Sequence, residues 1–237
     1  MPSFLQPHLT VDPEVAGGLV PSIPDASRPL PPLRDPDPMP AVVEPSPEPL
    51  VALRHPRITT VEAYRAAGWS SALPGTWVRR SVLDRLTAVV DDLPDPWGLH
   101  VFDAWRPLTL QAELFDAAYG DPGLPEGYIS EPLADPTTPP PHLTGGTVDV
   151  TLSFAGRPLA LGTGFDDFTD AAATDHHEMT PGPVRDLRRG LYWAMRRGGF
   201  VVLHCEWWHF EFGTRRWAGL TGGRASFGAA DLPVESA

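Results

Sequence analysis

The chain has 237 residues, of which 42% are hydrophobic and 20% are charged, a composition typical of a globular protein with one sizeable core. Its formal net charge is −12 and its basic residues are all arginine, so neither a nucleic-acid partner nor a lysine nucleophile is expected. No apolar run reaches the roughly 18 residues of a membrane helix, and residues 1–8 lack the pattern of a secretory signal. The single cysteine, Cys205, allows no internal disulfide and is expected to be an inert thiol. These features predict a cytoplasmic protein without a membrane partner.

Residues 1–52 are predicted to form a proline-rich N-terminal arm rather than a domain. They hold 14 of the 30 prolines of the chain. Proline lacks a backbone donor and has a restricted φ angle, so this density disfavours both helices and sheet ladders. The arm is therefore expected either to be disordered or to lie along the domain surface, where Leu19, Val20, Ile23 and Leu50 are available for docking.

The rest of the chain, residues 53–237, is predicted to be one catalytic domain with mixed helices and strands. Apolar periodicity predicts helices over 59–68, 81–93, 107–119 and 183–197, and strands over 99–105, 147–152 and 200–203. Thr59 and Glu62 have the spacing of a capping box at the start of the first helix. The arginine pairs 188–189 and 196–197 are expected on the solvated face of the last helix.

The stretch from His204 to Phe212 places Glu206 three residues before His209 within an aromatic run. A buried carboxylate is costly unless it is paired, hydrogen-bonded or bound to a metal. The two side chains are therefore candidates for a partly desolvated catalytic cleft. The alternative interpretation is an exposed Glu206 on an edge strand beside a core histidine.

A second polar pair is predicted on and before the strand over 147–152. The alternation of this strand places Asp149 on its open face while the valines face the core. The glycines at 145 and 146 allow the backbone to turn, so that His142 can return to the same face. A histidine and a carboxylate are thus expected to converge.

Together, His142, Asp149 and His209 form a three-ligand set that leaves a position open for water, as in a catalytic zinc site. Glu206 is then the natural general base, which takes the proton of the attacking water and returns it to the leaving amine. Arg106, at the carboxyl end of a predicted strand, would supply positive charge to the oxyanion. A non-haem iron oxygenase uses the same ligand types, but here six residues separate the first histidine from the aspartate, instead of the usual one.

These motifs resemble the VanX-type D-alanyl-D-alanine dipeptidases. The similar blocks are FDAWRP (102–107), HLTGGTVDVTL (142–152), GTGFDDF (162–168) and EWWHF (206–210), and the similarity covers roughly residues 53–212. The resemblance implies the hedgehog-like α+β fold of the zinc D,D-peptidases, with a small antiparallel sheet and flanking helices. It also implies one zinc ion per chain on His142, Asp149 and His209, with Glu206 and Arg106 catalytic. Asp166 would hold the free amino group of the substrate.

The sequence departs from the family pattern at two substrate positions. Pro140 replaces the serine that usually stands two positions before the first ligand, and Arg54-His55 replaces an early Arg-Tyr pair. The expected substrate is a small dipeptide, either D-Ala-D-Ala or a close analogue. The alternatives are a zinc amidase or peptidase with a different substrate in a biosynthetic pathway, and a non-catalytic zinc-binding module of the same fold. The sequence assigns no oligomeric state, and it leaves His176, His177 and His204 either near the site or on the surface.

Overall fold

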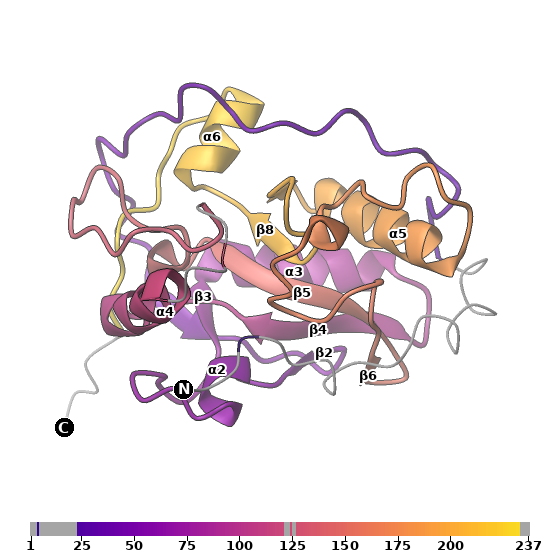
Figure 1. Ribbon diagram of the computed structural model, residues 1–237, viewed down its shortest axis with the longest axis horizontal. Helices are drawn as coiled ribbons and strands as arrows, with labels where there is room; N and C mark the ends of the chain where they lie inside the picture. Colours follow the sequence, from indigo (N-terminus) through magenta and orange to yellow (C-terminus); the bar gives the residue numbers. More distant parts are fainter. Residues whose placement is uncertain (1–3, 5–22, 121–123, 125–126, 233–237) are drawn as a thin grey trace.

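A six-stranded mixed sheet lies at the centre of the computed structural model, which describes residues 4, 23–120, 124 and 127–232 (Figure 1). The strands follow the order β2 (Ile58–Thr60), β4 (Trp97–Asp103), β5 (Thr147–Phe154), β8 (His209–Glu211) and β7 (Val201–Val202), with β6 (Arg157–Pro158) paired to β5. β2 runs parallel to β4, whereas the other pairs are antiparallel, so the expectation of a wholly antiparallel sheet is wrong at this edge. A separate two-stranded sheet joins β1 (Leu50–Ala52) to β3 (Trp77–Arg79).

The described α-helices are α2 (Ala63–Ala66), α3 (Arg80–Asp92), α4 (Leu108–Gly120), α5 (Pro183–Arg197) and α6 (Arg215–Thr221). Two short 3₁₀ helices, η3 (His142–Thr144) and η4 (Asp170–Ala172), lie in the connections. The predicted helices at 81–93, 107–119 and 183–197 are confirmed as α3, α4 and α5. Among the described residues, no helix has both the length and the apolar character needed to cross a membrane.

The predicted helix at 59–68 is wrong in its first half. Thr59 belongs to β2, and only Ala63–Ala66 are helical. Glu62 is the residue before this helix, has a φ of 50°, and makes no side-chain capping bond. β-Branched residues favour strands, and the parallel pairing of β2 with β4 supplies the backbone hydrogen bonds that outweigh the local capping pattern.

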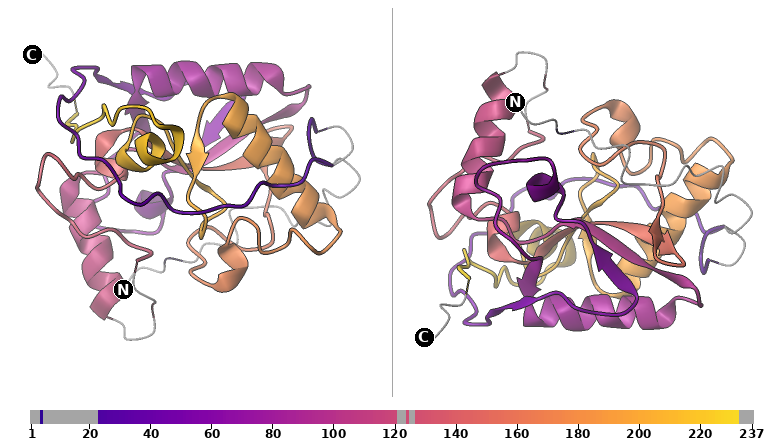
Figure 2. Two further views of the ribbon diagram at one scale, coloured as in Figure 1. Left: turned by 90° about the horizontal axis from the view of Figure 1, so that it is seen from above. Right: turned by 90° about the horizontal axis from the view of Figure 1, so that it is seen from below.

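The main hydrophobic core joins the sheet to α3 and α5, which also contact each other (Figure 2). Its fully buried members include Val82 and Leu86 of α3, Leu187 of α5, and Val148 and Val150 of β5. Complete burial of one such side chain contributes about 1.5–3 kcal/mol to the free energy of folding. The sheet that carries the candidate ligands therefore rests on a well-packed layer.

The first arginine pair of α5 is buried, contrary to the expectation of a solvated face. The guanidinium of Arg188 donates to the carbonyl oxygens of Leu161, Ala171 and Ala173, and Arg189 pairs with Glu178. The chain over 159–178 is largely irregular, and a guanidinium with five donors can satisfy several of its carbonyl groups. The second pair, 196–197, is exposed as predicted.

The described part of the N-terminal arm, residues 23–52, lies along the domain surface and crosses α6 and α5 (Figure 1 and Figure 2). Ile23 and Leu50 are buried, whereas Leu19 and Val20 lie outside the described residues. Backbone hydrogen bonds join Val42 to Thr137 at 2.9 Å and Ser46 to Ser226 at 2.7 Å. Of the two predicted states of the arm, this part adopts the docked one.

Candidate active site

Three neighbouring strands bring polar side chains together at one face of the sheet. Asp103, at the end of β4, stands opposite Asp149 on β5, and Asp149 stands opposite His209 on β8. Residues directly opposite each other on paired strands project their side chains to the same face. The register of the sheet thus places the two carboxylates and the imidazole side by side.

His142 comes from η3, just before β5, and returns to this face through a tight turn. Gly145 ends η3 with a φ of 70°, a left-handed conformation that glycine adopts without steric cost. A Cβ atom at this position would lie 2.4 Å from Cδ2 of Leu50, so a side chain here would also press on the docked arm. Nε2 of His142 reaches within 3.3 Å of Oδ2 of Asp149, which confirms the predicted convergence.

His142, Asp149 and His209 form a buried group that could hold a metal ion, with one ligand atom from each residue and all three atoms within 4.8 Å of one another. Nδ1 of His209 lies 3.2 Å from Oδ1 of Asp149. This oxygen is buried, yet it has no hydrogen-bond partner among the described residues. Two imidazoles and one carboxylate that converge without satisfying each other have the donor set of a catalytic zinc site.

Both imidazoles are oriented by a hydrogen bond at the nitrogen that faces away from the group. Nδ1 of His142 lies 2.6 Å from the carbonyl oxygen of Ala104, and Nε2 of His209 lies 3.1 Å from Oε1 of Glu211. A ring nitrogen that donates a proton to such an acceptor leaves the other nitrogen free to ligate a metal. The arrangement therefore presents Nε2 of His142 and Nδ1 of His209 to the ion.

The electrostatic surroundings of His209 favour a cation. Burial alone would lower the pKa of His209, but the carboxylates of Asp149 and Glu211 beside the ring raise this pKa to about 10. Burial raises the pKa of Glu211, and the hydrogen bond from His209 and the charge of Arg216 outweigh it, lowering the pKa to about 2. A metal ion would compete with the proton for Nδ1 of His209.

Glu206 lies in the turn between β7 and β8, with Oε2 3.6 Å from Nδ1 of His209. Only 4% of this residue is exposed, so the alternative of a solvent-exposed carboxylate is wrong. Burial raises the pKa of Glu206 to about 7, with the charge of His209 opposing the shift. A carboxylate with a pKa near neutrality can accept a proton and release it again, as general acid–base catalysis requires.

Arg106 points into the same cavity, with Nη2 3.9 Å from Oδ2 of Asp149. Its guanidinium donates to Asp103 at 2.8 Å, to Gln111 at 3.0 Å and to the hydroxyl of Tyr64 at 3.2 Å. Burial would lower the pKa of Arg106, but Tyr64, Asp103 and Asp149 together raise it further above its usual range. Arg106 is therefore a cation with a fixed orientation beside the candidate metal ligands.

Asp166 lines the cavity from the loop after β6 and has a φ of 57°, uncommon for a residue with a side chain. Its Oδ2 accepts a hydrogen bond of 2.8 Å from the hydroxyl of Tyr64. Burial and the charge of Asp149 raise the pKa of Asp166 well above its usual range. A positively charged group placed here would stabilise the ionised carboxylate.

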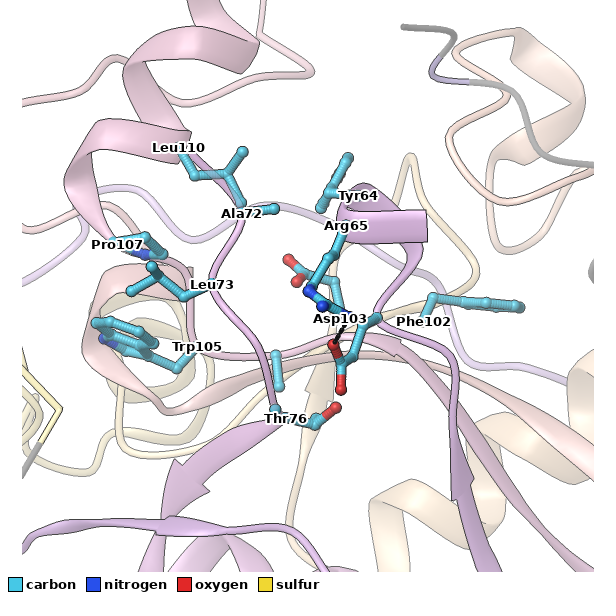
Figure 3. Close-up of a pocket in the computed structure, with 13 residues that line it drawn as sticks. Tyr64, Arg65, Ala72, Leu73, Thr76, Phe102, Asp103, Trp105, Pro107 and Leu110 are labelled. Carbon is cyan, nitrogen blue, oxygen red and sulfur yellow. Dashed lines mark hydrogen bonds and ion pairs between the residues drawn. The ribbon is translucent and has the colours of Figure 1, made fainter. Parts of the chain in front are cut away.

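Aromatic and apolar side chains close the cavity around these groups, with Tyr128, Phe168 and Leu203 in its lining. Tyr64 also lines a second, smaller pocket bordered by Arg65, Thr76 and Asp103 (Figure 3). Tyr64 thus separates two cavities. Asp103, which like Tyr64 accepts a hydrogen bond from Arg106, lines the smaller one. No sequence pattern pointed to Tyr64, Asp103 or Glu211 as residues near the site.

Four other positions singled out in the sequence, Pro140, His55, His204 and Cys205, do not line this cavity. Pro140 lines a neighbouring depression together with Arg216, and His55 does not belong to the described lining of the cavity. Nδ1 of His204 lies 3.1 Å from Oδ2 of Asp35 on the arm. Burial and the charge of Glu206 raise the pKa of Cys205 to about 12, so this residue stays a thiol, as expected.

This fold and site define a metallopeptidase, and the chain belongs to the peptidase M15 family, described as D-ala-D-ala dipeptidase, whose model matches residues 88–219. The match includes Arg106, Glu206 and all three candidate metal ligands. Membership makes the chain a hydrolase of the metallodipeptidase class and favours hydrolysis over the oxygenase alternative.

Two curated relatives carry the name D-alanyl-D-alanine dipeptidase. The chain is 27% identical over 168 residues to the protein of a Synechocystis species, a match that covers 57% of this chain and 68% of that protein. It is 35% identical over 114 residues to the protein of Escherichia coli, which covers 48% of this chain and 54% of that protein. The chain thus spans about half the length of the second relative.

Proposed function

We propose that this chain is a zinc-dependent dipeptidase that binds one zinc ion and hydrolyses D-alanyl-D-alanine or a close analogue. The observation that carries the proposal is the buried convergence of three ligand atoms within 4.8 Å. The carboxylate of Glu206 stands beside this group, 3.6 Å from one of the ligand nitrogens. The names of both relatives support a D,D-dipeptide as the substrate.

Zinc bound by His142, Asp149 and His209 would act as a Lewis acid that activates water for attack on the peptide carbonyl. Glu206 takes a proton from the attacking water at Oε2, as the bond between the water oxygen and the carbonyl carbon forms. The same carboxyl group then gives the proton to the amide nitrogen while the carbon–nitrogen bond breaks. The products are one amino acid with a new carboxylate and one with a new amine.

Arg106 stabilises the negative charge that develops on the carbonyl oxygen of the substrate. Its bonds to Asp103, Tyr64 and Gln111 hold the guanidinium in place before the substrate arrives. A donor that is already oriented needs no reorganisation in the transition state, and such donors are worth about 10²-fold to 10³-fold in kcat.

Asp166 binds the free amino group of the dipeptide. The carboxylate is buried close to Asp149 and Glu206, and a substrate ammonium would add compensating charge to that of Arg106. A peptide bond in the interior of a longer chain has no ammonium group on the residue that precedes it. Recognition of the amino group would therefore restrict cleavage to the first peptide bond of a substrate with a free amino group.

A metal analysis and a substrate screen on the purified full chain test this proposal. We expect about one equivalent of zinc and amine release from D-Ala-D-Ala, with much slower release from L-Ala-L-Ala and from N-acetyl-D-Ala-D-Ala. Hydrolysis of only an L,D- or L,L-dipeptide would keep the enzyme class and change the substrate. One equivalent of zinc without hydrolysis of any dipeptide would support the non-catalytic alternative.

A further inference from the structure

The N-terminal arm is connected to the metal-ligating group by a continuous chain of hydrogen bonds. Nη1 of Arg216, on α6, donates to Oδ1 of Asp35 on the arm. Nε of Arg216 donates to Oε1 of Glu211 at 2.9 Å, and the same oxygen lies 3.1 Å from Nε2 of His209. A residue of the arm thus reaches a candidate ligand through two intervening side chains.

The inner part of this chain is enclosed and has little freedom to rearrange. The side chain of Glu211 is 1% exposed and that of Arg216 is 14% exposed. The hydroxyl of Thr214 donates to the second oxygen of Glu211, so three donors act on one carboxylate. Because Thr214 and Arg216 fix the plane of the carboxylate, they also fix the direction of its bond to His209.

The outer part of the chain is attached to α6 by several contacts of the arm. Arg215 donates to the carbonyl oxygens of Pro40 at 3.0 Å and Met39 at 3.2 Å. Pro36 packs so closely on Gly219 that a Cβ atom there would lie 2.6 Å from the proline ring. These contacts hold the arm over α6 (Figure 2).

We propose that Glu211, Arg216 and Asp35 are positioning residues of the metal site, so that the N-terminal arm completes a site whose ligands all come from the catalytic domain. Glu211 orients the imidazole of His209, Arg216 orients Glu211, and Asp35 orients Arg216. This inference rests on the proposed metal at His142, Asp149 and His209. It adds that the affinity for the metal depends on a segment outside the matched family region of 88–219.

The chain offers a matched control for the contact between the arm and a helix. Asp25, also on the arm, pairs with Arg197 of α5, and both of these side chains are 33% exposed. None of the described contacts of this pair involves a candidate ligand or Glu211. Asp25→Asn therefore weakens the docking of the arm without touching the proposed chain.

The test measures zinc affinity by competition with a chelator, the visible spectrum of the Co²⁺-substituted protein, and kcat. We expect Glu211→Gln to lower zinc affinity about 10-fold to 100-fold, the usual effect of removing a group that orients a ligand. Arg216→Gln should lower the affinity about 10-fold. Asp35→Asn should lower it only about threefold, and less at high salt, because exposed charges are screened.

A double variant distinguishes the proposed chain from a second contact of Asp35. In the Arg216→Gln background, Asp35→Asn should cause no further loss, since residues that act through a shared partner are not additive. Asp35 also contacts His204 through Oδ2. We expect His204→Ala to keep both the zinc affinity and the Co²⁺ spectrum of the wild type.

The outcomes separate this inference from the proposed function. A wild-type chain that binds no metal would contradict the proposed function itself. If the wild type binds zinc, and Asp35→Asn and Arg216→Gln bind it equally well with unchanged Co²⁺ spectra, the inference is wrong. It is also wrong if Asp25→Asn and Asp35→Asn lower the affinity equally, since general docking of the arm would then explain both effects. Asp35 is half exposed, so its variant tests the inference even if Arg216→Gln fails to fold.

Discussion

Nδ1 of His209 lies 3.2 Å from Oδ1 of Asp149, and the two residues stand opposite each other in the register of β8 and β5. The spacing of two candidate ligands is therefore set by the backbone hydrogen bonds of a sheet. Ligands carried by regular elements are held more precisely than ligands carried by loops. Only His142 comes from a connection, and the turn at Gly145 limits its position.

Each of the substitutions His142→Ala, Asp149→Ala and His209→Ala should remove the metal, because catalytic zinc sites use three protein ligands. The measurement is the zinc content after dialysis of the purified variants. His177→Ala is the control: His177 is not one of the candidate ligands, so this variant should keep one equivalent of zinc. A variant of the three that keeps a full equivalent and normal turnover would show that its residue is not a ligand.

Arg106→Lys should keep zinc and lose about 10²-fold in kcat. Lysine keeps the positive charge, but it cannot make the separate bonds to Asp103, Gln111 and Tyr64 that orient the guanidinium. Arg106→Ala is a poorer test, because it leaves the carboxylate of Asp103 without its partner and should lower the free energy of unfolding by about 3–5 kcal/mol. An effect of Arg106→Lys on KM alone would instead assign Arg106 to ground-state binding.

Asp166→Asn should raise KM for dipeptides with a free amino group and have a smaller effect on N-acetylated substrates. Asparagine tolerates the left-handed backbone at this position, where φ is 57°, so the fold should be retained. The measurement is KM for each pair of free and blocked substrates. A KM that rises equally for both members of a pair would rule out recognition of the amino group.

His100→Phe should remove an acid sensitivity of the fold that lies away from the active site. His100 is buried on β4, Oγ1 of Thr59 lies 2.7 Å from its Nδ1, and burial lowers its pKa to about 4. Below pH 6.5 the unfolded chain takes up a proton that the folded chain does not, so stability falls between pH 6.5 and 4. The full loss is about 3 kcal/mol, at 1.36 kcal/mol for each pKa unit.

The measurement for His100 is the urea midpoint of the wild type and of His100→Phe across this pH range, in the presence of a chelator. The difference in urea midpoint between the wild type and His100→Phe should change between pH 6.5 and 4 and be constant at higher pH. His176→Phe is the control, because His176 is exposed. A constant difference over the whole range would show that His100 is not responsible.

The parts of the site that could be predicted from the sequence depend on local spacing. The position of Asp149 on the open face of the sheet follows from strict alternation in a strand. The return of His142 to the same face follows from the two glycines before that strand. Glu211 could have been found in the same way, because it follows His209 by two residues on β8 and residues at this spacing share a face of the sheet. Its acidic side chain beside a candidate ligand was the available signal.

The parts that could not be predicted depend on contacts between distant segments. Asp35 and Arg216 are 181 residues apart, and no periodic pattern connects them. The parallel pairing of β2 with β4 likewise joins distant segments. Because of this pairing, Thr59 belongs to a strand and not to the start of a helix. Arg188 was misplaced because its partners are backbone carbonyl groups, which side-chain patterns do not reveal.

Glu206→Gln tests the central claim most directly, because it preserves the size of the side chain and removes the group that can accept the proton of water. The measurement is kcat for D-Ala-D-Ala with the zinc content determined on the same sample. We expect one equivalent of zinc, an unchanged fold, and a loss in kcat of about 10⁴-fold or more, since one carboxylate both takes and returns the proton. A zinc-loaded variant that retains a tenth of the wild-type kcat would contradict the proposed mechanism.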